Sequence, residues 1–139
     1  MPDHRYDLEE RLLEYAALII RLVEKLPSTR AGNHVAGQLL RSGTSVLPNH
    51  GEGEGAESRN DFIHKLGICH KELRESRRWL RLIQRVPLLA DSRELENALG
   101  ETDELVRIFA ASIRTARANA EDGKLCREEQ EAYLTEEKE

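Results

Sequence analysis

Apolar residues recur at steps of three and four through most of the chain, which is the spacing of one face of an α-helix. The first such segment runs from about Asp7 to Leu26 and ends at Pro27 and Ser28. Its apolar positions cover more than one side of the helix, so we expect contacts from two directions. These positions are Leu8, Leu12, Leu13, Tyr15, Ile19, Ile20, Leu22, Val23 and Leu26.

The second segment runs from about Ala31 into the upper forties, with Val35, Leu39 and Val46 as its apolar positions. It is rich in Gly, Ala and Ser, which permit close approach of a neighbouring helix but lower the helix propensity. Pro48 and the glycine-rich residues 51–55 predict that this helix ends or kinks there.

The third segment has the clearest boundaries. Ser58, followed by Asp61, predicts the N-terminal cap of a helix, and Pro87 predicts its end. A fourth helix is predicted to start near Asp91 and to continue to about Asn119. The apolar positions of the third helix are Phe62, Leu66, Cys69, Leu73, Leu80 and Ile83, with Ser76 in the same row. Those of the fourth are Leu95, Leu99, Leu105, Phe109 and Ile113.

Four helices with short connections predict an all-α fold, an antiparallel up-down-up-down four-helix bundle. Charged residues make up 34% of the 139 residues and aromatic residues only 4%, against about 25% charged in an ordinary domain. Residues 119–139 hold eight acidic and three basic side chains, the whole net charge of −5. We therefore expect a bundle over residues 1–118 and a flexible acidic tail, disordered or a frayed helix, over 119–139, which either solvates the protein or screens a basic surface.

Membrane and disulfide-rich classes are excluded by the pattern. The longest apolar run, residues 15–20, is far shorter than the roughly 20 residues of a membrane span. No signal peptide is visible, and Cys69 and Cys126 cannot form a disulfide framework. We therefore expect a cytoplasmic protein without membrane contact.

Catalytic and metal-binding patterns are also missing. Asp61 and His64 give the Asp-x-x-His spacing once, whereas a di-iron bundle needs the related Glu-x-x-His motif on two helices. A metal site remains conceivable only at four residues near one another in the chain, His50, Glu52, Glu54 and His64. A glycine-rich stretch lacks the supporting shell that orients metal ligands. We expect no metal, no cofactor and no enzymatic activity.

One charged surface stands out between Lys65 and Arg85, where seven basic residues accompany two acidic ones. Five of the cations share a helical face about two residues, or roughly 200°, from the apolar face, so they point away from the core. We call them the basic stripe: Lys71, Arg74, Arg78, Arg81 and Arg85. A row of cations suits a phosphate backbone. The alternative is a solvated face that Glu75 neutralises against Arg78 and Lys71.

Several stretches resemble the bacterial four helix bundle protein family, also called the 23S rRNA-intervening-sequence proteins. The stretches are Gln38–Val46, Asn49, Glu52, Ala56–Leu66 and Lys71–Arg81. The accessory variability determinant of diversity-generating retroelements is a relative of this family. The resemblance covers about residues 8–115 and implies a four-helix bundle assembled as a ring, typically a homopentamer. It implies nucleic-acid or reverse-transcriptase binding only for the retroelement branch, and no reaction or cofactor.

Six residues match positions of the family motif: Arg41, Ser42, Ser45, Asn49, Glu52 and Trp79. We expect the first five to be structural, with a buried Asn–Glu–Arg cluster that sets the helix register. Trp79 is expected to pack in the core or at a subunit interface.

Two functions follow from these observations. The first is a non-catalytic oligomeric module that binds structured RNA, or an RNA-handling partner such as a reverse transcriptase, through the basic stripe. The second is a protein–protein scaffold ring with no nucleic-acid role.

Overall fold

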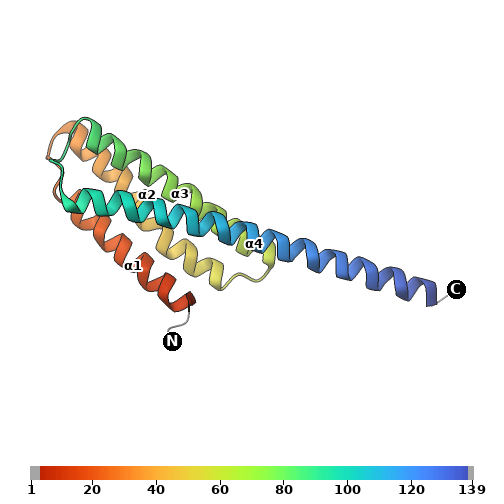
Figure 1. Cartoon of the computed structure of the whole chain (residues 1–139). Coiled ribbons are helices and arrows are strands. Elements are labelled where there is room, and N and C mark those ends of the chain that lie inside the picture. Colours follow the sequence, from red (N-terminus) through yellow and green to blue (C-terminus); the bar gives the residue numbers. More distant parts are fainter. Residues whose placement is uncertain (1–3, 138–139) are drawn as a thin grey trace.

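The structure, a computed structural model, describes residues 4–137, including the side chains of residues 8–123 and 128–135. This range forms no strand and four helices: α1 (His4–Val23), α2 (Arg30–Glu54), α3 (Arg59–Arg85) and α4 (Arg93–Glu137). Consecutive helices run in opposite directions (Figure 1), and α1 and α3 both pack against α2 and α4. The predicted antiparallel four-helix bundle is confirmed. No helix within residues 4–137 is long and apolar enough to cross a membrane.

Three of the helices begin with a side-chain cap. The hydroxyl groups of Thr29, Ser58 and Ser92 each accept a hydrogen bond from the backbone N–H three residues further on, which satisfies one of the free donors of the first turn. The cap predicted at Ser58 is confirmed. The start predicted at Asp91 is slightly early, because the Ser92 hydroxyl accepts from the N–H of Leu95 at 3.2 Å.

Helix α2 does not end at the residues that predict an end or a kink. Pro48 lies inside the helix, which continues to Glu54. Packing against α3 supports this segment. Gly53 is buried so close to α3 that an added Cβ would lie 3.2 Å from Cβ of Lys65, and the Cys69 thiol donates to the Val46 carbonyl at 3.6 Å. Tertiary contacts therefore outweigh the low helix propensity of proline and glycine here.

A layer of four hydroxyl groups crosses the middle of the core, one from each helix. The Tyr15 and Thr102 hydroxyls are 2.7 Å apart, and those of Ser42 and Ser76 are 2.8 Å apart. All four residues are at most 1% exposed. The Thr102 hydroxyl also lies 2.6 Å from the carbonyl oxygen of Ala98. Buried hydroxyls without partners are costly, so the layer favours one relative position of the four helices.

Helices α1 and α2 approach each other closely at Gly43. A Cβ at this position would lie 2.8 Å from Cγ2 of Ile19, whereas the neighbouring Gly37 faces open space. The small residues of α2 thus allow the close packing that their composition predicts.

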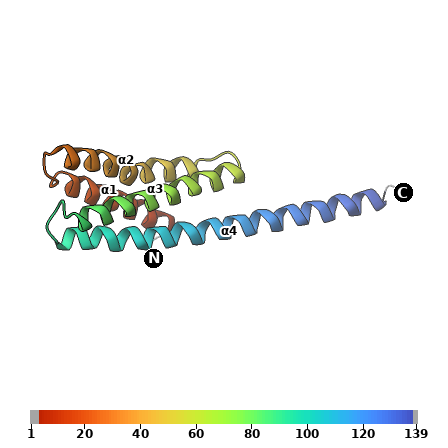
Figure 2. The ribbon, with the colours of Figure 1, turned by 90° about the horizontal axis from the view of Figure 1, so that it is seen from above.

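Helix α4 is much longer than the other three and leaves the bundle (Figure 2). The sequence pattern ended the fourth helix near Asn119, whereas the structure continues it to Glu137. Its last buried residue is Ala116, and no described side chain after it is buried. We call residues 119–137 the C-terminal extension. Its flexibility stays a prediction.

The two glycines of α2 provide a matched test of the helix contact. Gly43→Ala is expected to destabilise the protein by about 1–3 kcal/mol, because the new methyl group overpacks Ile19. Gly37→Ala is expected to stabilise it by up to about 1 kcal/mol through helix propensity alone. Urea denaturation measures both changes. Equal effects of the two substitutions would contradict the close contact.

Tyr15 should make stability depend on alkaline pH. Burial raises the pKa of Tyr15 to about 12, partly offset by hydrogen bonds to Thr102 and Ser76. The unfolded chain releases this proton near its ordinary pKa of about 10. The contribution of Tyr15 to stability is therefore constant below pH 10, and between pH 10 and 12 it falls by about 1.4 kcal/mol per pH unit.

Denaturation of wild type and Tyr15→Phe across this pH range tests this contribution. The difference in unfolding free energy between the two proteins should shrink as the pH rises from 10 to 12. A difference that stays constant would show that the Tyr15 hydroxyl is not shielded from solvent.

Candidate functional site

The basic stripe lies on the outer face of α3. The side chains of Lys71, Arg74, Arg78, Arg81 and Arg85 are all exposed. The opposite face of the same helix is buried in the core and consists of Leu66, Cys69, Leu73, Ser76, Leu80 and Ile83. The stripe therefore points into solvent, as the angle between the two sets of positions predicts.

Two other cations of the same segment are neutralised by neighbouring helices. Nζ of Lys65 lies 2.6 Å from Glu52 of α2, and Nε of Arg77 lies 2.9 Å from Asp103 of α4. None of the ion pairs between described side chains involves a stripe residue. The unpaired cations of this segment are thus the five that share the outer face.

The acidic residues beside the stripe are occupied by Arg41 of α2. Its guanidinium group lies 3.1 Å from the carboxylate of Glu72 and also pairs with that of Glu75. The expected neutralisation of Arg78 and Lys71 by Glu75 is therefore wrong. An arginine fork can bind two carboxylate oxygens at once, so one residue of α2 pairs with both acids of residues 65–85.

A shallow hollow of about 460 Å³ lies at the C-terminal end of the stripe. It is lined by Arg78, Arg81, Leu82, Gln84 and Arg85. Leu82 is 42% exposed. The sequence could have indicated it, because this apolar residue lies just outside the buried row that contains Leu80 and Ile83. Sequence reasoning did not include Leu82 or Gln84 in the site.

The charge of the stripe also affects the protonation of His70 on the same helix. Burial and the nearby charge of Arg74 lower the pKa of His70. His70 therefore favours its neutral form and adds no charge at neutral pH.

The five polar motif residues of α2 do not form one cluster. Ser42 belongs to the buried hydroxyl layer, and Ser45 and Asn49 bond to backbone carbonyls one turn earlier in α2, at 3.0 and 2.8 Å. Glu52 and Arg41 each pair with side chains of α3. The expected buried Asn–Glu–Arg cluster is wrong, because the three side chains have separate partners and both charged ones are exposed.

Trp79 packs against the core from the edge of α3. Its ring stands edge-on to that of His34, with centroids 6.0 Å apart. The indole N–H is buried and has no hydrogen-bond partner among the described residues. Trp79 thus occupies a packing position rather than an exposed stacking platform.

The residues considered for a metal are held by different neighbours. His50 is 5% exposed, lies 3.5 Å from the carboxylate of Glu54 and stands edge-on to the ring of Phe109. Glu52 is paired with α3, and His64 is exposed. No group of three or more His, Cys, Asp or Glu side chains in the described part of the chain is placed to hold a metal. Absence of metal and cofactor stays a prediction.

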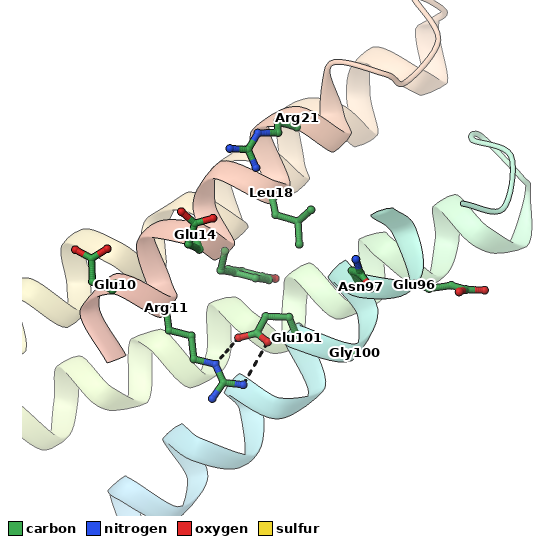
Figure 3. A pocket seen from close by; sticks show the side chains of 10 residues that line it. Glu10, Arg11, Glu14, Leu18, Arg21, Glu96, Asn97, Gly100 and Glu101 are labelled. Carbon is green, nitrogen blue, oxygen red and sulfur yellow. Dashed lines mark hydrogen bonds and ion pairs between the residues drawn. The ribbon is translucent and has the colours of Figure 1, made fainter. Parts of the chain in front are cut away.

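An open groove of about 690 Å³ lies between α1 and α4 (Figure 3). Arg11 reaches across it to Glu101, at 2.5 and 3.2 Å, and the hydrogen bond raises the pKa of Arg11. The charged pair connects the two helices, which is a structural role. The groove is remote from the stripe, because α1 is diagonally opposite α3.

Cys69 of α3 is fully buried in the core of the bundle. Burial raises the pKa of the Cys69 thiol to about 12. The reactive form of cysteine is the thiolate, so Cys69 is a packing residue and not a nucleophile.

The fold and the site define an all-helical bundle with a positively charged outer face on α3. The chain belongs to the 23S rRNA-intervening sequence protein family, whose model matches residues 6–111. This confirms the family to which Gln38–Val46 and the later stretches pointed. The chain is also similar to a crystal structure from Bacteroides thetaiotaomicron VPI-5482, a protein of unknown function from the S23 ribosomal protein family. The TM-score is 0.70 at 33% sequence identity, covering 76% of this chain and 96% of that chain. No curated protein matches the sequence.

Proposed function

We propose that this protein is a non-catalytic, cytoplasmic module that binds structured RNA through the basic stripe. The observation that carries the proposal is the set of five exposed, unpaired cations on one face of α3, beside acids that Arg41 occupies.

The geometry of the stripe suits a phosphate backbone. From Lys71 to Arg85 it extends about 21 Å, with a charge every 4.5–6 Å or so. Phosphate contacts need charge and position but no base readout. The chain has six Phe, Trp and Tyr residues, and Trp79 is packed, so stacking on unpaired bases is a minor contribution.

We further propose that the protein is a homo-oligomer, typically a pentamer as the family resemblance implies. Leu13 and Ile20 lie seven residues apart on α1 and are 48% and 45% exposed in the single chain. Apolar side chains in this arrangement fit a subunit contact. A ring repeats the stripe in every subunit, so weak contacts with one RNA would add as avidity.

The RNA proposal is tested with Arg74→Glu combined with Arg81→Glu. The double variant should bind a fluorescent RNA hairpin at least tenfold more weakly. The slope of log K against log salt should become less negative by about 2. Each phosphate contact contributes about 0.9 to this slope, and the double variant loses two contacts. Fluorescence anisotropy at several salt concentrations measures both. Its stability should change by about 0.5 kcal/mol or less, as for other surface substitutions.

A matched control carries the same charge change away from the stripe. Arg30 and Arg59 are exposed first residues of α2 and α3 and form no ion pair between described side chains. Arg30→Glu with Arg59→Glu should leave RNA binding close to wild type. Equal losses in both double variants would contradict a specific stripe. A wild-type protein that does not bind RNA at low salt would favour the scaffold function.

The assembly proposal is tested by replacing the exposed apolar pair of α1. Leu13→Glu with Ile20→Glu should reduce the mass from that of an oligomer towards the 15.9 kDa of one chain, because two charges cannot be buried in an apolar contact. Light scattering measures the mass, and circular dichroism checks the fold. A wild-type protein that is monomeric at micromolar concentration contradicts the proposal.

A further inference from the structure

None of the described side chains of the C-terminal extension is buried in its own chain. The extension lies outside the residues 6–111 that define the family, and it continues α4 away from the bundle (Figures 1 and 2). Residues 119–137 extend about 28 Å at 1.5 Å per residue. Most helical stability in proteins comes from packing rather than propensity. A surface that received the extension would therefore stabilise it.

The charges of the extension are opposite to those of the basic stripe. Glu121, Asp122, Glu128 and Glu129 are all exposed, and no ion pair between described side chains involves them. Residues 119–139 carry a net charge of −5, and residues 65–85 carry +5. Among the described side chains, these two helical surfaces of opposite sign form no ion pair with each other.

The two surfaces also share a repeat. The acids come in pairs seven residues apart, 121 with 122 and 128 with 129, and the cations 71 and 74 recur seven residues later as 78 and 81. Seven residues are two helical turns, or about 10.5 Å. Because both patterns repeat every two turns, each pair of acids on one helix can lie beside a pair of cations on a neighbouring helix. Charges on either side of a coiled-coil contact pair in this way.

The stripe of the same chain is out of reach of a straight extension. Ala116, the last buried residue of α4, precedes a segment that leaves the bundle at the end where α3 begins (Figure 2). Lys71 lies about 18 Å along α3 from Arg59, in the opposite direction. The complementary surface must then come from another molecule.

We propose that the acidic C-terminal extension of one chain docks on the basic stripe of a second copy. The occupant of the stripe in the absence of RNA is thus a neighbouring chain, and RNA must displace it. This contact goes beyond RNA binding and does not depend on it. It also covers Leu82 and Val86, which are 42% and 57% exposed at the edge of the stripe.

The test uses the full chain with a dye at Thr135→Cys, without RNA. The labelled chain also carries Cys126→Ser and the stripe substitutions Arg74→Glu, Arg78→Glu and Arg81→Glu, so that only its extension can dock. Cys69 is buried and does not compete for the label. Titration with unlabelled wild type should raise the anisotropy of the dye, less at 500 mM than at 50 mM salt because screening shortens the range of the charges. An anisotropy that does not rise during the titration overturns docking on a second copy.

Charge exchange identifies the two surfaces. An unlabelled chain with Arg74→Glu, Arg78→Glu and Arg81→Glu should bind the labelled chain at least tenfold more weakly. A labelled chain with Asp122→Lys, Glu128→Lys and Glu129→Lys should bind unlabelled wild type at least tenfold more weakly, but should bind the stripe-reversed chain well. Failure of this rescue overturns the proposal, while the RNA proposal is unaffected because RNA is absent.

A matched control separates the stripe from net charge. Arg30, Arg59 and Arg93 are the exposed first residues of α2, α3 and α4. Changing all three to Glu gives the same charge change as the stripe-reversed chain and places acids where the helix dipole favours them. This chain should bind the labelled extension like wild type. A loss equal to that of the stripe-reversed chain would overturn the proposal.

Discussion

Four buried hydroxyl groups, one on each helix, set the relative positions of the helices in this bundle. Sliding α1 by a turn would move the Tyr15 hydroxyl about 5.4 Å and leave it unpaired, at a cost of about 1–3 kcal/mol. The hydroxyls of Ser42, Ser76 and Thr102 also bond to carbonyls of their own helices. The layer also positions the surface. Arg41 and Glu75 adjoin Ser42 and Ser76 in the sequence, so the contact between the two serines places the arginine beside the carboxylate.

That surface ion pair decides the charge of α3. With Glu72 and Glu75 bound to Arg41, and Arg77 bound to α4, the outer row is left with positive charge alone. Isolated exposed ion pairs contribute little to stability, about 0–1 kcal/mol. Their effect here is on recognition, because they determine which cations remain available to an anionic partner.

The long α4 gives the chain a second surface of opposite sign. Its acids lie beyond the last buried residue, Ala116, so they are separated in space from the cations that would neutralise them. Under the two proposals, RNA phosphates and the extension of another copy are polyanions that compete for one face. Salt screens the charges of both contacts and therefore weakens both.

The sequence by itself determined the four helices, the cap at Ser58 and the outward direction of the basic stripe. These features depend on local hydrogen bonds and on the helical repeat, which a single segment carries. Only the tertiary structure decided that α2 continues through Pro48, that Arg41 pairs with Glu72 and Glu75, and that Tyr15 meets Thr102. Those contacts join residues 31 to 87 positions apart, and the partner of each side chain depends on which helices become neighbours.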